Sequence, residues 1–307
     1  MNRKELQGIA FALLAVSLFS LSLPMTRWAL ESYSPLFTAM GRALIAGLLA
    51  IAFLKVARLP LVPPSHHREF IYTVAGAVFG WPILIALALM RTQTAPVAVV
   101  AAIMPLTTAV IAVLRGHENV SRQFWIASSI GTGILFYFTA TRGSLKSQDL
   151  IADLFAIGAV LASSFCYVQG AELTRIYPGW QVISWVVVLA LPVTATCSAY
   201  IWFTQVDTAS ITTQANIGML VLGFFSMYLS FMPWYRGLSD AGTARGAQVQ
   251  QLQVFLTLGW SALILGEKIP GTALPCALGI AISVSWALLS RSQRSSTSHV
   301  SSIQERE

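Results

Sequence analysis

A single charged residue, Arg42, stands inside the largely apolar segment 34–54 of this 307-residue chain. In a helix that rises about 1.5 Å per residue, it would lie roughly 12 Å from the start of that segment. A guanidinium held there can bind a carboxylate or a phosphate through two parallel hydrogen bonds. It can equally donate hydrogen bonds to carbonyls and hydroxyls of neighbouring helices, so a binding role and a structural role both stay open.

Four glutamines in the segment 243–265 form a second candidate site: Gln248, Gln250, Gln251 and Gln253. At about 100° per helical residue, Gln250 and Gln253 project about 60° apart, and Gln248 and Gln251 do so on a different side. Four amides cannot all face lipid without a large free-energy cost. We therefore expect at least one pair to line a wet cavity and to hydrogen bond a polar or zwitterionic cargo. Hydrogen bonds between helices are the alternative.

Two prolines, Pro82 and Pro105, interrupt the predicted helices 70–90 and 95–114. Proline lacks a backbone N–H, and its ring crowds the carbonyl four residues earlier, so each position is a candidate kink or hinge. A carbonyl freed in this way can contact cargo where it lines a cavity.

These candidates depend on apolar segments long enough to cross a bilayer, which takes about 20 helical residues. Hydrophobic residues make up 56% of the chain and charged residues only 10%, whereas a soluble protein carries roughly 25% charged residues. Apolar runs broken by charges, prolines or glycines predict ten helices. They are 6–25, 34–54, 70–90, 95–114, 122–140, 152–172, 180–203, 216–235, 243–265 and 272–290.

The ten predicted helices form two sets of five, so the second set enters the membrane from the side opposite to the first. The halves also resemble each other at a shift of about 150 residues, at which Gly8 corresponds to Gly158. We therefore expect an all-α integral membrane protein with ten transmembrane helices in two inverted five-helix repeats. The repeats would be residues 1–146 and 147–291, and residues 292–307 would form a disordered cytoplasmic tail.

The distribution of lysine and arginine predicts the orientation, because cytoplasmic loops are enriched in both. With the N-terminus inside, thirteen of them fall on the cytoplasmic side and five on the opposite side. Both termini are thus predicted to be cytoplasmic, in a multi-pass protein of the bacterial inner membrane. The net charge of +7 does not indicate nucleic-acid binding, because the basic residues stand singly in short connections.

Several features together resemble the drug/metabolite transporter superfamily, specifically its EamA-like members. They are the two five-helix repeats, Pro35 and Arg42 in the second helix, a turn of small residues before the fourth and ninth helices, and the Gly-His-Glu or Gly-Glu that ends those helices. The resemblance covers roughly residues 6–290. It implies a secondary transporter that exports a small organic metabolite, such as an amino acid, by alternating access.

The resemblance also bears on individual residues. In the family the central cavity is bounded largely by helices at the positions that hold Trp81 and Tyr228, so both are candidates for apolar contact with cargo. Family members with chemically different cargos carry an arginine where this chain has Arg42, which favours the structural role for that residue.

The sequence offers little for other chemistry. All four histidines fall in predicted loops or the tail, and the three cysteines lack metal-ligand spacing, so neither metal nor cofactor is expected. No phosphate-binding glycine loop indicates ATP hydrolysis. An integral-membrane enzyme acting on a lipid or isoprenoid, and a channel or receptor without carrier activity, stay as alternatives. The expected partners are a small-molecule substrate and the lipid bilayer, with a homodimer left open.

Overall fold

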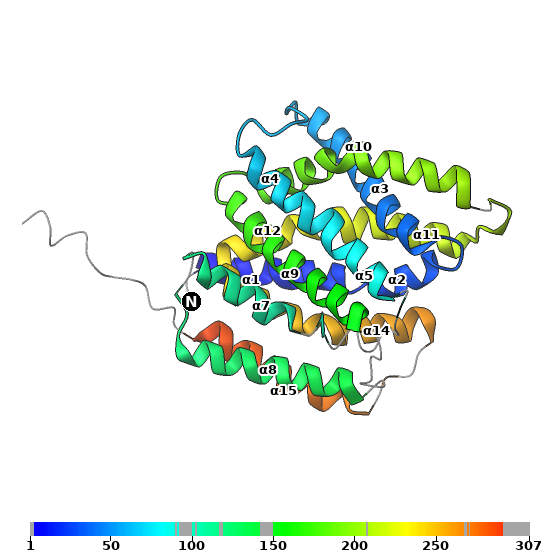
Figure 1. Ribbon diagram of the computed structural model, residues 1–307. Helices are drawn as coiled ribbons and strands as arrows, with labels where there is room; N and C mark the ends of the chain where they lie inside the picture. The colour runs from blue at the N-terminus through cyan, green and yellow to red at the C-terminus, as the bar shows by residue number, and fades with distance from the viewer. Residues whose placement is uncertain are drawn as a thin grey trace, which may run out of the picture.

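The computed structural model of the protein describes residues 3–89, 91, 100–101, 103–116, 119–141, 150–206, 208–266, 269 and 271–290. Within these residues the chain is helical, with turns and short connections but no strand, as predicted (Figure 1). The elements are α1 (Arg3–Phe19), α2 (Ser22–Ala29), α3 (Pro35–Val56), α4 (His67–Val74), η1 (Ala75–Gly80), α5 (Trp81–Leu89), α7 (Met104–Leu114), α8 (Arg122–Thr141), α9 (Leu150–Leu173), α10 (Gly179–Gln205), η2 (Thr208–Ser210), α11 (Thr213–Val221), η3 (Leu222–Leu229), α12 (Phe231–Ala241), α13 (Thr243–Gln248), η4 (Val249–Leu252), α14 (Gln253–Leu265) and α15 (Ala273–Leu289).

Six helices within the described residues are long and apolar enough to cross a membrane. Some of the six comprise several consecutive elements: one contains α1 and α2, and another contains α11, η3 and α12. The six are Arg3–Ala29, Pro35–Val56, His67–Ile85, Leu150–Leu173, Gly179–Gln205 and Thr213–Ala241. Two further apolar helices, Met104–Leu114 and Ala273–Leu289, are shorter. This architecture is that of a multi-pass membrane protein.

The helix ends follow from local chemistry. The Ser34 hydroxyl accepts a hydrogen bond from the Phe37 N–H at 3.2 Å, and Pro35 occupies the first turn of α3, where a missing N–H has no cost. Between α12 and α13 the chain turns at Gly242, whose φ of 90° lies in the left-handed region that favours glycine.

Two of the membrane helices contain a wider π-helical segment followed by a proline. Pro82 comes two residues after η1, and Pro233 comes shortly after η3. A proline ring crowds the carbonyl four residues earlier, and a wider turn relieves that clash. At the end of η3, the N–H and the hydroxyl of Ser230 both donate to the Phe225 carbonyl, at 2.8 and 2.6 Å. The predicted hinge position Pro82 thus lies beside a widened turn.

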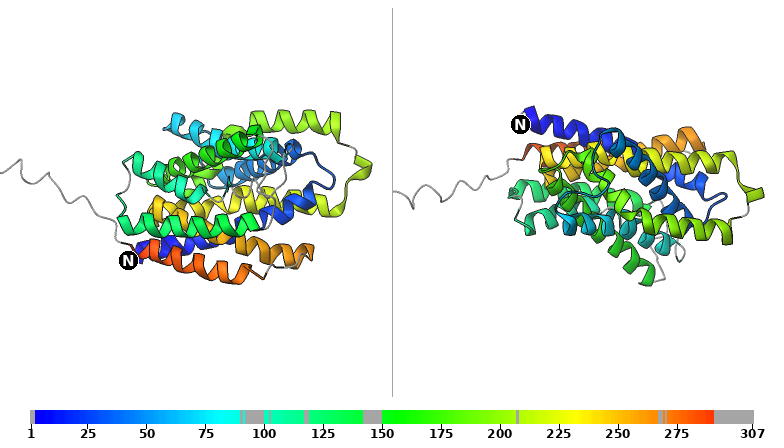
Figure 2. Two further views of the ribbon diagram at one scale, coloured as in Figure 1. Left: turned by 60° about the horizontal axis from the view of Figure 1, so that its bottom comes forward. Right: turned by 90° about the horizontal axis from the view of Figure 1, so that it is seen from above.

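Most helices run along the long axis of one bundle (Figure 1). α3 packs on α10, α1 on α12, α8 on α15, and η1 with α5 on α9. Each of these pairs combines a helix from the first half of the chain with one from the second. The beginning of α1 and the end of α15 lie at the same end of the bundle (Figure 2).

Close contact between α1 and α12 depends on Gly237, where a Cβ atom would lie 2.7 Å from the Ala12 nitrogen. We expect Gly237→Ala to separate the two helices and to lower the melting temperature of the detergent-solubilised protein. Gly259→Ala in α14 is the matched control, because a Cβ there would meet nothing within 4 Å. Alanine is the better helix former, so the control should melt at the same or a slightly higher temperature. Equal melting of the two variants would contradict this packing.

Candidate functional site

A polar cluster surrounds Arg42 deep within the bundle. From α3, the Arg42 guanidinium donates a hydrogen bond from Nη2 to the Ser226 hydroxyl in η3 at 3.0 Å. The Ser226 hydroxyl is in turn hydrogen bonded to the hydroxyl of Ser22 in α2. The cluster therefore joins the first two predicted membrane helices to the π-helical segment of the second half.

The charge of Arg42 is not balanced by a carboxylate among the described residues, whose ion pairs all involve other side chains. Its Nε is buried and makes no hydrogen bond. Arg42 as a whole is half-buried. A charge without a charged partner in such surroundings has a desolvation cost, so an anion that reached the guanidinium would be attracted to it.

Tyr167 of α9 connects Arg42 to the glutamines. It lies within electrostatic range of the guanidinium, and its hydroxyl accepts a hydrogen bond from Nε2 of Gln250 at 3.4 Å. Oε1 of Gln250 is buried and makes no hydrogen bond. The Tyr167 ring packs edge-on against Trp234, with the ring centroids 5.2 Å apart. The cluster thus offers an unused donor on Arg42 and an unused acceptor on Gln250.

The other predicted glutamines have different surroundings. Gln248 and Gln251 are buried, and Nε2 of Gln251 donates to Oε1 of Gln248 at 2.8 Å. Nε2 of Gln248 donates in turn to the Pro105 carbonyl at 3.2 Å, which connects α13 to α7. This pair makes the contact between helices that the sequence left as the alternative. Gln253, at the start of α14, is half-buried.

The remaining predicted site residues lie in or beside the hydrophobic core. Trp81 is half-buried and packs against that core. Tyr228 is only 1% exposed, and its hydroxyl lies 2.7 Å from that of Ser184 in α10. Pro105 stands in the first turn of α7, directly after the turn at Ile103. The proposed contacts of these residues with cargo stay predictions.

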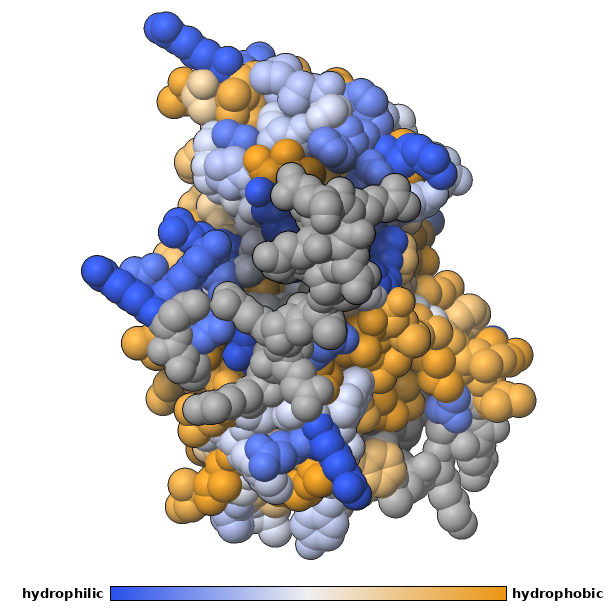
Figure 3. All heavy atoms as spheres, turned by 90° about the vertical axis from the view of Figure 1, so that its left-hand side faces the viewer, coloured by the Kyte–Doolittle hydropathy of each residue, from blue (hydrophilic) through white to orange (hydrophobic). Residues whose placement is uncertain are grey.

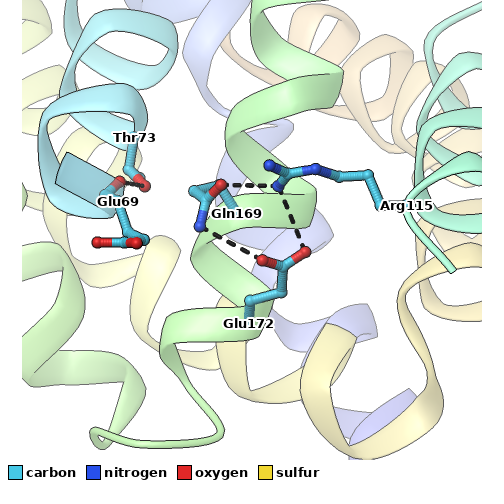
Figure 4. Close-up of polar contacts among 5 residues, drawn as sticks. All are labelled: Glu69, Thr73, Arg115, Gln169 and Glu172. Carbon is cyan, nitrogen blue, oxygen red and sulfur yellow. Dashed lines mark hydrogen bonds and ion pairs between the residues drawn. The ribbon is translucent and has the colours of Figure 1, made fainter. Parts of the chain in front are cut away.

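Charged side chains gather at the end of the bundle where α1 begins. Nη1 of Arg115 in α7 donates to Oε1 of Gln169 at 2.7 Å and lies 3.4 Å from Oε1 of Glu172, both in α9 (Figure 4). Nη2 of Arg245 in α13 lies 3.3 Å from Oε1 of Glu5 in α1. Three described ion pairs at this end join the two halves of the chain. We refer to Arg115–Glu172 and Arg245–Glu5 as the inter-half ion pairs; the third, between Nζ of Lys4 and Oδ1 of Asp240 at 3.4 Å, has a largely exposed lysine. Seen end-on, this face carries several groups of hydrophilic residues (Figure 3).

At the opposite end of the bundle, the contacts between the two halves that involve the described residues are hydrogen bonds. The Tyr33 hydroxyl donates to Oδ1 of Asn216, and the Ser32 hydroxyl donates to the Ser210 carbonyl at 3.0 Å. Burial raises the pKa of Tyr33, which keeps its hydroxyl protonated as a donor. Here hydrogen bonds hold the halves together, whereas the ion pairs described between the halves lie at the other end.

A sequence model of the EamA-like transporter family matches residues 6–139 and again residues 150–302. The chain belongs to the EamA-like transporter family. The resemblance derived from the residues is thereby confirmed, and the family indicates a membrane transporter and not an enzyme.

This EamA-like transporter is similar to one curated protein in sequence and to one solved structure in fold. The uncharacterized transporter YdeK of Bacillus subtilis (strain 168) is 36% identical over 279 residues, which cover 91% of this chain and 95% of YdeK. A protein of known crystal structure matches 92% of this chain and 98% of its own with a TM-score of 0.76 and 18% identity. At that identity the second likeness shows the fold alone.

We refer to Arg42, Ser22, Ser226, Tyr167 and Gln250 as the central cluster. The sequence reasoning missed three of them: Ser22, Ser226 and Tyr167. Each is a polar side chain in an apolar segment, which is the signal that singled out Arg42. Serine and tyrosine are common enough in membrane helices for that signal to be weak. Only the spatial proximity of α2, α3, α9 and η3 distinguishes these three from the rest.

Proposed function

We propose that this EamA-like transporter is a secondary transporter that exports a small organic metabolite, an amino acid or a related compound, by alternating access. The cargo would bind at the central cluster between two inverted repeats of five helices. The two separate family matches support the repeats, and the export direction is taken from the family resemblance. Both termini would be cytoplasmic, in the bacterial inner membrane.

The observation that carries this proposal is the way the two halves meet. They share a half-buried arginine that has no carboxylate partner among the described residues, and the described ion pairs between the halves lie at one end of the bundle. In alternating access, rocking of the halves opens one end while the other closes around a fixed central site. The side chains of Arg115 and Glu172 stay 33% and 22% exposed, so they can separate into water. The ion pairs would then act as the cytoplasmic gate.

The predicted orientation can be tested with single cysteines at exposed positions of the two ends. In a background without Cys166, Cys197 and Cys276, we expect Ser210→Cys to react with a membrane-impermeant maleimide in intact cells. Ala57→Cys should react only after lysis, because it would face the cytoplasm. Reaction of both positions in intact cells, or the reverse pattern, would contradict the orientation.

The transport function is tested by comparing cells that express the protein with matched cells that lack it. The cells are loaded with labelled amino acids or challenged with toxic analogues. We expect lower retention, and higher resistance, for a subset of these compounds. In proteoliposomes the flux should saturate and distinguish stereoisomers, whereas a channel would give neither result. Equal retention of every compound in both kinds of cell would overturn the proposal.

A further inference from the structure

We infer that the connection between α3 and α4 is a docking surface for anionic phospholipid headgroups. Residues 55–62, which we refer to as the headgroup loop, combine two exposed cations with three exposed apolar side chains. The cations are Lys55 and Arg58, and the apolar residues are Val56, Leu61 and Val62. The inference concerns the lipids around the transporter and is independent of its cargo and of the direction of transport.

The headgroup loop lies at a membrane surface because it joins two membrane helices. Pro35–Val56 has 22 residues, so at about 1.5 Å per residue it spans the whole hydrocarbon core of about 30 Å. The chain enters the membrane again with His67–Ile85. Val56 is 85% exposed and Val62 is 54% exposed. Exposed apolar side chains at this depth meet the boundary between acyl chains and headgroups, where neighbouring cations can reach the lipid phosphates.

The backbone at Arg58 disfavours an arginine. α3 ends in a Schellman motif, in which the Leu59 N–H donates to the Leu54 carbonyl at 2.9 Å. The Arg58 N–H donates to the Lys55 carbonyl at 3.0 Å in the same motif. Arg58 therefore occupies the left-handed position, with a φ of 54°, where glycine has no steric cost and other residues do. A residue kept in such a conformation supports a role for its side chain.

Contacts with the second half of the chain fix the loop in place. The Pro60 carbonyl accepts a hydrogen bond from Nε1 of Trp185 in α10 at 2.8 Å. Shortly after the headgroup loop, the Ser65 hydroxyl lies 2.6 Å from that of Tyr177. The rings of Tyr177 and Trp185 pack edge-on, with their centroids 5.1 Å apart. The cations are thus presented by a held segment, which lowers the entropy lost when a lipid binds.

The protein does not neutralise the two cations of the headgroup loop. The ion pairs of the described residues involve neither Lys55 nor Arg58. The one acidic residue between positions 55 and 69 of the sequence is Glu69, which directly follows a further cation, Arg68. Anionic headgroups supply the missing negative charge at this depth. A basic residue close to an anionic membrane surface strengthens binding about fivefold.

The experiment titrates phospholipid into the purified, detergent-solubilised protein and follows the melting temperature. The probes are phosphatidylglycerol, phosphatidylcholine with the same acyl chains, and inorganic phosphate. We expect phosphatidylglycerol to reach half of its maximal stabilisation at a content about 10- to 30-fold lower than phosphatidylcholine does. Phosphate alone should not stabilise the protein. Lys55→Gln combined with Arg58→Gln should remove most of this preference. The matched control, Arg3→Gln with Arg122→Gln, removes two exposed cations from α1 and α8 and should retain it.

Arg58→Gly separates lipid binding from folding. Glycine suits the left-handed backbone, so without lipid this variant should melt no lower than the native protein, yet it should need about fivefold more phosphatidylglycerol. Arg58→Lys keeps the charge and should keep the lipid response. Three results would each overturn the inference. They are stabilisation by phosphatidylcholine or phosphate equal to that by phosphatidylglycerol, a preference that persists in the double variant, and an Arg58→Gly protein that melts lower without lipid while it keeps the native preference.

Discussion

Arg42→Ala is expected to weaken cargo binding by about 10- to 100-fold while the protein stays folded in the membrane. Hydrogen bonds to a charged group contribute about 1.5–3 kcal/mol, and each 1.4 kcal/mol corresponds to a tenfold change in affinity. The variant loses the cationic partner of the cargo and leaves Ser226 with Ser22 as its partner. Calorimetry with the best-binding amino acid gives the affinity, and membrane abundance and melting temperature report the fold.

Two further variants separate binding from structure at this position. Arg42→Lys keeps the charge and loses the planar fork, so it should bind more weakly than the native protein and better than Arg42→Ala. Ser226→Ala removes one partner of the guanidinium and keeps the charge, so its effect should be smaller than that of Arg42→Ala. If Arg42→Ala loses abundance and melting temperature in proportion to transport, while its residual binding is unchanged, Arg42 has the structural role.

Breaking both inter-half ion pairs with Glu5→Gln and Glu172→Gln should open the end that they close. An ion pair of this exposure contributes up to about 1 kcal/mol, so the double variant should raise the population open at that end by about 5- to 30-fold. The reporter is Val168→Cys. Val168 is 1% exposed in the native protein and immediately precedes Gln169, farther from the end that carries the ion pairs. Its rate of reaction with a small maleimide, in a background without native cysteines, should rise in proportion.

Glu31→Gln is the control for this experiment. Glu31 lies at the opposite end, where its Oε2 accepts a hydrogen bond from the Thr212 hydroxyl at 3.4 Å. The control removes one negative charge, against two in the double variant, and is expected to leave the rate at Val168→Cys as it is in the otherwise native protein. High salt, which screens ion pairs, should imitate the double variant. A reporter that reacts equally in all of these backgrounds would mean that the ion pairs do not set which end is open.

Much of the fold could be predicted because the bilayer imposes one length scale on every helix. Segment 122–140 corresponds to α8 at Arg122–Thr141, and segment 180–203 to α10 at Gly179–Gln205. Prolines and glycines at the breaks, such as Pro35 and Gly242, set the ends within a few residues. The π-helical segments were not predicted, because a wider turn depends on how the neighbouring carbonyls are accommodated and leaves no pattern in hydropathy.

The site was only partly predictable, because spacing along one helix does not say what faces it. On a regular α-helix, the side chains of Gln248 and Gln251 would project about 60° apart. The chain continues into the 3-10 turn η4, where residues three apart eclipse, and the two amides hydrogen bond to each other. Arg42 was recognised from its charge alone, whereas its partners Ser226 and Tyr167 come from distant parts of the sequence. Predicting them requires the packing of α3 against the second half.

Arg42 has no charged counterpart on α10, the helix that packs against α3 and contains no Asp, Glu, Lys or Arg. Of the two packed helices α3 and α10, which come from different halves of the chain, only α3 thus carries a charged residue near its middle. A bound amino acid would therefore meet the guanidinium with its carboxylate, and its other groups would face the rest of the bundle. Contact at the carboxylate is the same for both mirror images, so discrimination between enantiomers would depend on the contacts that those other groups make.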